Sequence, residues 1–138
     1  MKKSFLVAIT LLVLVLGSEC LAFNTAVIGG MRNGLALGMM LENGLSRSAT
    51  FRLGVEASTS NSPGIVFVGG KWFLGVMDSS YPIYMSGGLV GYMGNNSEAG
   101  PYISLVFENL LDMSPLFLET GIDIVNSGRL QLQIGYYL

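Results

Sequence analysis

The chain has 138 residues with no histidine, one cysteine, seven basic and nine acidic side chains, and a formal net charge of −2. Without histidine, the chain cannot form a Ser-His or Cys-His catalytic pair or a histidine-bound metal site. It also has no basic cluster of the kind that binds nucleic acid. We therefore predict a non-enzymatic protein with no catalytic, cofactor-binding or metal-ligating residues and no nucleic-acid partner.

Residues 1–22 are typical of a cleavable secretory signal peptide. Two lysines precede an apolar run over residues 5–16, and Cys20 and Ala22 supply the small residues that a cleavage site after residue 22 requires. The apolar run is shorter than the roughly 20 residues of a transmembrane helix. We therefore expect export and one mature domain over residues 23–138, with a membrane anchor or a lipoprotein site at Cys20 as the alternatives.

The expected mature domain carries few charges. Residues 1–22 contain two of the seven basic residues, one of the nine acidic residues and the one cysteine, so 116 residues remain with five basic and eight acidic side chains. Soluble domains ordinarily have about a quarter charged residues, whereas this domain has 13. Without cysteine it can form neither a disulfide nor a thiol site. Its surface is therefore expected to be largely apolar.

Turn residues divide this domain into eight segments. Asn-Gly pairs and similar sequences favour tight hairpin turns, and seven such clusters occur, at residues 32–34, 43–44, 58–63, 75–82, 95–100, 112–115 and 126–128. The segments between them have the length of strands. The spacing predicts an all-β fold, an antiparallel up-and-down β-barrel of about eight strands.

Apolar and polar residues alternate within these segments, which is the period of a strand with two different faces. The last segment is the clearest, where one face is formed by Leu130, Leu132, Ile134, Tyr136 and Leu138. The alternation is weaker over 65–74 and 83–93 and weakest over 23–31. Gly-Gly pairs at 29–30, 69–70 and 87–88 predict tight curvature or a crowded interior, unless these pairs are themselves turns.

Eight charged residues fall within the segments, opposite the apolar face. We predict that they form a polar network of structural ion pairs in the barrel lumen: Glu42, Arg52, Glu56, Lys71, Glu108, Glu119, Asp123 and Arg129. The other five lie in or beside expected turns: Arg32, Arg47, Asp78, Glu98 and Asp112. A catalytic cross-strand carboxylate pair, such as Glu108 with Glu119, remains an alternative.

The apolar face is expected to meet lipid. A lysine or arginine on the lipid side of a barrel costs roughly 2–4 kcal/mol at the bilayer midplane, and a closed barrel pairs every backbone group within the membrane. Leu130, Leu132, Ile134, Tyr136 and Leu138 are then lipid-facing residues. The alternative is a soluble periplasmic β-barrel whose apolar lumen binds a small hydrophobic ligand. An oligomeric barrel is also possible.

The segment Gln133-Ile134-Gly135-Tyr136-Tyr137-Leu138 resembles the last strand of bacterial outer-membrane barrels, although it ends in leucine rather than phenylalanine. The resemblance to the small eight-stranded class covers the mature domain as architecture. It implies a location in the outer membrane, with membrane lipid and the barrel assembly machinery as partners. The turns near 33, 60, 97 and 127 would face outward and are short, unlike the long external loops of that class. We therefore expect a structural or surface and lipid-interaction role.

Overall fold

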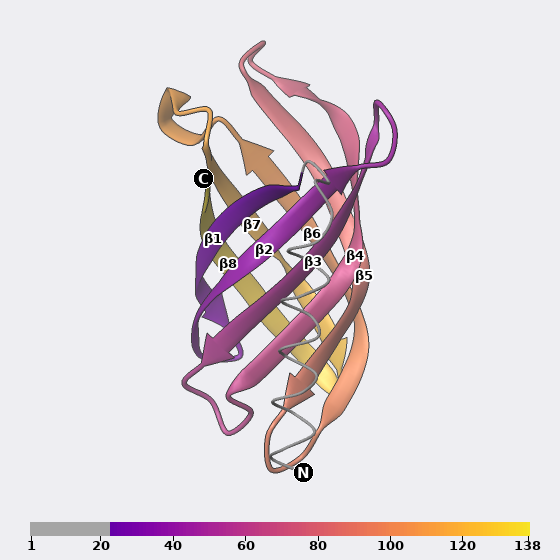
Figure 1. Ribbon diagram of the computed structural model, residues 1–138, viewed down its shortest axis with the longest axis vertical. Helices are drawn as coiled ribbons and strands as arrows, with labels where there is room; N and C mark the ends of the chain where they lie inside the picture. Colours follow the sequence, from indigo (N-terminus) through magenta and orange to yellow (C-terminus); the bar gives the residue numbers. More distant parts are fainter. Residues whose placement is uncertain (1–22) are drawn as a thin grey trace.

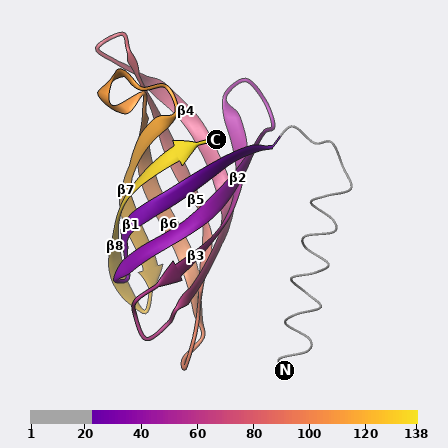
Figure 2. The same ribbon diagram turned by 60° about the vertical axis from the view of Figure 1, so that its left-hand side comes forward.

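The computed structural model describes residues 23–138, so the predicted signal peptide at 1–22 lies outside the described residues. Eight antiparallel strands follow one another around a closed barrel, and β8 pairs back to β1 (Figures 1 and 2). The prediction of an all-β, up-and-down barrel of about eight strands is confirmed. The elements are β1 (Asn24–Arg32), β2 (Leu35–Gly44), β3 (Ala49–Ser58), β4 (Gly64–Met77), β5 (Tyr81–Met93), β6 (Glu98–Glu108), a 3₁₀ turn η1 (Leu110–Asp112), β7 (Leu116–Val125) and β8 (Ser127–Tyr137).

The two ends of the barrel differ in what they carry. The terminal end holds Asn24 and Leu138 together with the β2–β3, β4–β5 and β6–β7 connections, whereas the far end holds the other four turns (Figure 1). The far-end turns are short, as expected. Over the part of the chain that the structure describes, no helix has the length and apolarity to cross a membrane.

Several strands extend further than the turn residues suggest. The expected turn over 75–82 is limited to 78–80, because β4 continues to Met77 through an irregularity between Phe73 and Gly75. Arg32 ends β1 and Glu98 begins β6, so both lie beside turns, as expected, but as the end residues of strands. Turn composition shows where a chain reverses, but pairing with the neighbouring strand decides how far the ladder continues.

The Gly-Gly pairs lie inside strands, so the alternative in which they form turns is wrong. At Gly88 a Cβ atom would lie 2.1 Å from the carbonyl oxygen of Val68 on the neighbouring strand, and at Gly69 it would lie 2.3 Å from that of Gly87. No side chain fits between strands that approach so closely. These glycines therefore allow the tight curvature that closes a narrow barrel.

The two faces of the strands differ sharply in polarity. Along β8, Leu130, Leu132, Ile134 and Tyr136 are 75, 49, 52 and 45% exposed, whereas Gln131 and Gln133 are buried. All ten charged residues in the strands lie on the inward face, buried or half-buried. Within residues 23–138, the outward face of the barrel therefore carries no charge.

Two aromatic rings lie in the lumen directly over glycines of the paired strand. Phe67 on β4 packs over Gly54 on β3, and Phe117 on β7 packs over Gly135 on β8. A Cβ atom at Gly54 would lie 2.2 Å from Cζ of Phe67, and at Gly135 it would lie 2.0 Å from Cζ of Phe117. The absent side chains thus make room for rings in a lumen that has little free space.

Gly54→Ala is expected to lower the free energy of unfolding by about 1–3 kcal/mol, because the added methyl group overpacks the lumen. The Phe67 ring cannot move away freely, since it lies 4.8 Å below the Arg32 guanidinium and 5.9 Å from the Tyr102 ring. Gly44→Ala is the matched control, since a Cβ atom there meets nothing within 4 Å. Urea unfolding followed by the fluorescence of Trp72 measures both; equal stability of the two variants would contradict the packing argument.

Candidate functional site

The barrel lumen holds the polar and charged side chains and is the candidate functional site. Its side chains form three ion-paired layers, each centred on one cation, from the far end to the terminal end. The cations are Arg32, Arg52 and Lys71, and together they contact five carboxylates. Because each cation comes from a different strand, closure of the barrel is needed to assemble the network.

The layer nearest the far end is centred on Arg32, which is fully buried. Its Nε and Nη2 donate to the two oxygens of Asp123 at 2.8 and 3.0 Å, and its Nη1 donates to Glu56 at 3.0 Å. The guanidinium lies 4.8 Å from the Phe67 ring and 5.3 Å from the Tyr102 ring. These ion pairs and ring contacts surround the guanidinium, so we assign the Arg32 side chain a structural role.

The placement of Arg32 corrects the sequence prediction, which put it beside a turn and left it out of the lumen network. The adjacent Asn33-Gly34 pair does form the turn, and Arg32 is the last residue before it. Arg32 is an even number of positions from the buried Ala26 and Ile28, so the alternation of the strand could have placed it on the inward face. Alternation is weak in β1, however, because glycine and small residues occupy much of both faces.

The central layer is built around Arg52 of β3. Its Nη1 and Nη2 donate to the two oxygens of Glu119 at 3.0 and 2.7 Å, and its Nε lies 2.9 Å from an oxygen of Glu42. Ser86 accepts a further hydrogen bond from Nη1 at 2.7 Å, and Ser104 donates to Glu119 at 2.6 Å. A bidentate guanidinium–carboxylate pair of this kind is geometrically specific, and it ties β3 to β7 across the lumen.

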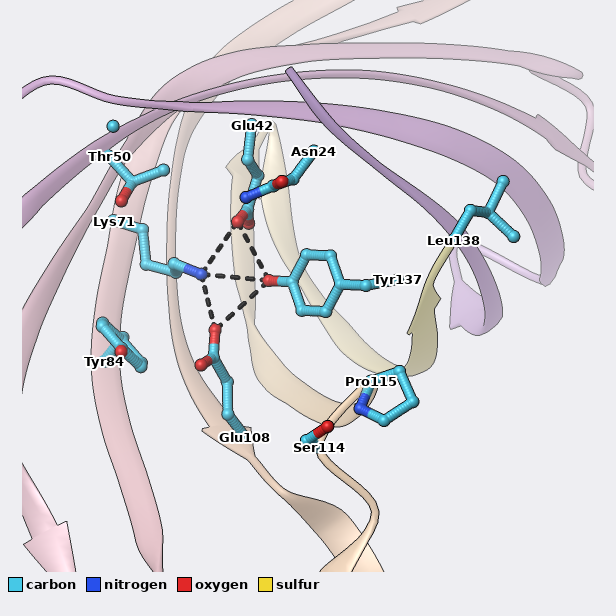
Figure 3. Close-up of a pocket in the computed structure, with 11 residues that line it drawn as sticks. Asn24, Glu42, Thr50, Lys71, Tyr84, Glu108, Ser114, Pro115, Tyr137 and Leu138 are labelled. Atoms are coloured by element: carbon cyan, nitrogen blue, oxygen red, sulfur yellow. Dashed lines mark hydrogen bonds and ion pairs between the residues drawn. The ribbon is translucent and has the colours of Figure 1, made fainter. Parts of the chain in front are cut away.

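The layer at the terminal end is centred on Lys71, whose Nζ donates to Glu42 at 2.9 Å, to Glu108 at 2.7 Å and to the Tyr137 hydroxyl at 3.0 Å (Figure 3). The ammonium also lies 4.6 Å from the Tyr84 ring. Tyr137 donates in turn to Glu42 at 2.9 Å. Four strands thus converge on one ammonium group.

A cavity of about 640 Å³ opens beside this layer at the terminal end, lined by Lys71, Glu42, Glu108, Tyr84, Tyr137, Asn24, Gly44, Thr50, Ser114, Pro115 and Leu138. Figure 3 shows the polar groups of Lys71, Glu42, Glu108 and Tyr137 pointing toward one another. Both carboxylates and the ammonium already have partners. The cavity is therefore a polar mouth of the barrel whose charged groups are already paired.

The far end has a separate ion pair and a second polar cavity. Arg129 Nη2 donates to Glu98 at 2.7 Å, Asn126 also donates to Glu98, and the Arg129 guanidinium lies 4.6 Å from the Tyr92 ring. The cavity has a volume of about 460 Å³ and is lined by amide and hydroxyl side chains with this pair: Asn33, Ser60, Asn61, Ser62, Asn95, Asn96, Glu98 and Arg129.

The structure places all eight charged residues assigned to the lumen on the inward face, but not in one cluster. Seven of them belong to the three layers, and Arg129 lies apart at the far-end mouth. Sequence reasoning missed Arg32 and Glu98, and it did not identify the uncharged hydrogen-bonding groups of the network: Ser86, Tyr92, Ser104, Gln133 and Tyr137. All seven of these residues occupy inward-facing positions of their strands, and that place in the alternation was the signal that could have identified them.

The arrangement holds its charges in fixed pairs. Glu108 and Glu119, the alternative carboxylate pair, bind different cations in different layers, Lys71 and Arg52. Among residues 23–138, no group of three or more histidine, cysteine, aspartate or glutamate side chains is placed to hold a metal.

Comparison of the chain with protein-family models, curated proteins and solved structures gives no match. The function must therefore be argued from the barrel itself.

Proposed function

We propose that the chain is a non-enzymatic outer-membrane β-barrel protein with a structural or surface and lipid-interaction role. One observation carries the proposal: the outward face of all eight strands is uncharged, while the ten charged residues of the strands point into the lumen. In water this distribution leaves a belt of exposed leucine, isoleucine, valine and methionine side chains, of which Leu35, Leu37, Leu89 and Leu130 are 61 to 75% exposed. Lipid is the solvent that such a surface suits.

The dimensions of the strands support the same proposal. A membrane-spanning strand tilted at about 45° needs roughly 9–11 residues, and the shortest strand, β1, has nine. The barrel is closed, so it has no strand edge with unpaired backbone groups to expose to lipid. Eight strands enclose only enough room for side chains, and the ion-paired layers occupy that room. The proposed role is therefore not that of an open channel.

The soluble alternative requires an apolar lumen for a hydrophobic ligand. The lumen instead contains Arg32, Arg52, Lys71 and their carboxylates among its buried apolar side chains, and the exposed large apolar side chains are outside. A soluble barrel with that outer surface would expose an apolar patch far larger than the few hundred Å² usual for monomers. Polarity of the two faces thus favours the membrane proposal.

Gel mobility of the membrane fraction tests the proposal. A folded transmembrane barrel is expected to stay compact in SDS until it is boiled, because its backbone hydrogen bonds close on themselves, so unheated and boiled samples should migrate differently. The sample is the full chain expressed in a bacterium with an outer membrane. Recovery from the periplasm as soluble protein with identical mobility in both lanes would reject the membrane barrel.

A further inference from the structure

The apolar surface extends past the barrel wall on one side of the terminal end. β4 and β5 have 14 and 13 residues, against 9 to 11 for the other strands, so their hairpin projects beyond the neighbouring strands. The extra residues of β4 are apolar, and four of them are each about half exposed: Phe73, Leu74, Val76 and Met77. A strand built only to span the bilayer would not need this apolar extension.

The β6–β7 connection continues this surface. Leu111 is 76% exposed and Met113 47% exposed, and Figure 2 shows this connection beside the β4–β5 hairpin. Leu110 and Leu111 line a recess of about 390 Å³ with Met77 and Tyr81 of the hairpin and with Phe107, Leu118 and Glu108 of the barrel. Phe107 and Leu118 continue the outward face of β6 and β7. We call the exposed apolar residues of the β4–β5 hairpin and of the β6–β7 connection the patch. The patch and the barrel wall therefore form one continuous apolar surface.

The backbone of the connection turns Leu111 outward at a cost. Leu111 has φ 55°, and its neighbours Asn109 and Asp112 have φ 57° and 59°. Left-handed backbone is unfavourable for a leucine, and in water the exposed apolar side chain adds to that cost. An apolar environment around Leu111 would offset both.

The polar groups of the two segments already bond to one another. The Tyr81 hydroxyl donates to Asp112 at 3.1 Å, and the Asn109 amide donates to the carbonyl oxygen of Ser80 at 3.0 Å. The tip of the hairpin, Asp78 and Ser79, is exposed and polar. A protein interface ordinarily makes a hydrogen bond for every 100–200 Å² or so, and the apolar residues on either side of this tip offer few polar groups to make them. Aliphatic side chains with nearby tyrosines are instead typical of the lipid–water boundary.

We propose that the β4–β5 hairpin and the β6–β7 connection insert into the interfacial layer of the bilayer leaflet at the terminal end, with Leu110, Leu111 and Met113 in contact with acyl chains. This inference rests on the proposed function, since it requires the barrel to be in a membrane. The opposite side of the same end lacks the extension: the β2–β3 turn has Ser46, Arg47 and Ser48 around its one exposed leucine, Leu45. The barrel is thereby embedded more deeply on its β4–β7 side.

Tryptophan depth measurements test the inference in phosphatidylcholine vesicles. The wild-type chain has one tryptophan, Trp72, on the outward face of β4. Two variants move the fluorophore: Trp72→Phe with Leu111→Trp, and Trp72→Phe with Leu45→Trp as the matched control. The control suits the test because Leu45 is 70% exposed, close to the 76% of Leu111, and lies at the same end.

Lipid brominated near the headgroup is expected to lower the emission of the tryptophan at 111 by roughly half, because an interfacial apolar side chain lies only ~5–10 Å deep. Aqueous iodide is expected to quench it roughly threefold less than the tryptophan at 45, which stays in water. If the Leu111→Trp variant lacks the heat-dependent gel shift, Met113→Trp in the Trp72→Phe background is measured in the same way.

Each other outcome overturns the inference in a recognisable way. Iodide quenching at 111 as strong as at 45, with Trp72 of the wild type still quenched by brominated lipid, would reject the insertion and leave the proposed function standing. Protection at 111 from both iodide and brominated lipid would show that protein, such as a second copy, covers the patch. No lipid quenching of Trp72 would reject the membrane barrel itself.

Discussion

Leu132→Arg is expected to block assembly of the barrel into the membrane or to destabilise the assembled barrel by roughly 2–4 kcal/mol, which is the cost of a lipid-facing arginine at the bilayer midplane. Leu132 lies at the middle of β8, points outward and is 49% exposed. Its side chain has no carboxylate to pair with, because the outward face of the described strands is uncharged. The readouts are the heat-dependent gel shift and urea unfolding from vesicles.

Leu132→Met is the matched control, because it introduces a long unbranched side chain, as arginine does, but without the charge, and it is expected to assemble normally. The adjacent Gln131 is a poor inward control. Its side chain is 2% exposed, and its partner on β1 is Arg32, so an arginine there would meet a like charge in a filled lumen. Normal assembly of Leu132→Arg would mean that the outward face of β8 does not meet lipid.

Arg52→Met is expected to lower the free energy of unfolding by about 3–5 kcal/mol, because removing one partner of a buried ion pair leaves an uncompensated charge. Arg52 is fully buried and is bonded to both oxygens of Glu119. Glu42 keeps its contact with Lys71 when Arg52 is lost, whereas Glu119 keeps no cation. The barrel should unfold at a markedly lower urea concentration, as followed by Trp72 fluorescence in vesicles.

Adding Glu119→Gln to Arg52→Met is expected to restore about 1–2 kcal/mol, because the unpaired buried charge is removed while a hydrogen-bonding group remains for Ser104. Arg129→Met serves as the control at the far-end mouth. Its pair with Glu98 is only partly buried, with the two side chains 21 and 24% exposed, so the loss should be about 1 kcal/mol or less. Equal losses for Arg52→Met and Arg129→Met would show that the central layer contributes no more than a surface pair.

The strand pattern and the polarity of the two faces could be predicted from sequence because they depend on local features. Successive side chains of a strand point to opposite sides whatever the strand pairs with, so the alternation of Leu130 with Gln131 along β8 was sufficient to separate the two faces. The same argument failed at Arg32, where Asn33-Gly34 indicated a turn and the small residues of β1 obscured the alternation. Strand ends at Met77 and Glu98 depended on pairing with neighbours.

The lumen network illustrates where local features stop being informative. Arg32 and Asp123 lie on the inward faces of different strands, and their side chains meet although the residues are 91 positions apart in the chain. Lys71 meets Glu42, Glu108 and Tyr137 from three other strands. No spacing along the chain encodes these partners.

From the amino-acid sequence alone, the number of strands, their alternating faces and the segregation of charge to one face can be inferred, because each is a property of a single segment or of one turn. Closure of β8 on β1 and the choice of partner for each buried charge come only with the assembled barrel. The register at every strand pair sets the height at which each inward side chain enters the lumen, and closure requires all eight registers to be compatible at once. The partners of Arg32, Arg52 and Lys71 are therefore a consequence of the whole barrel.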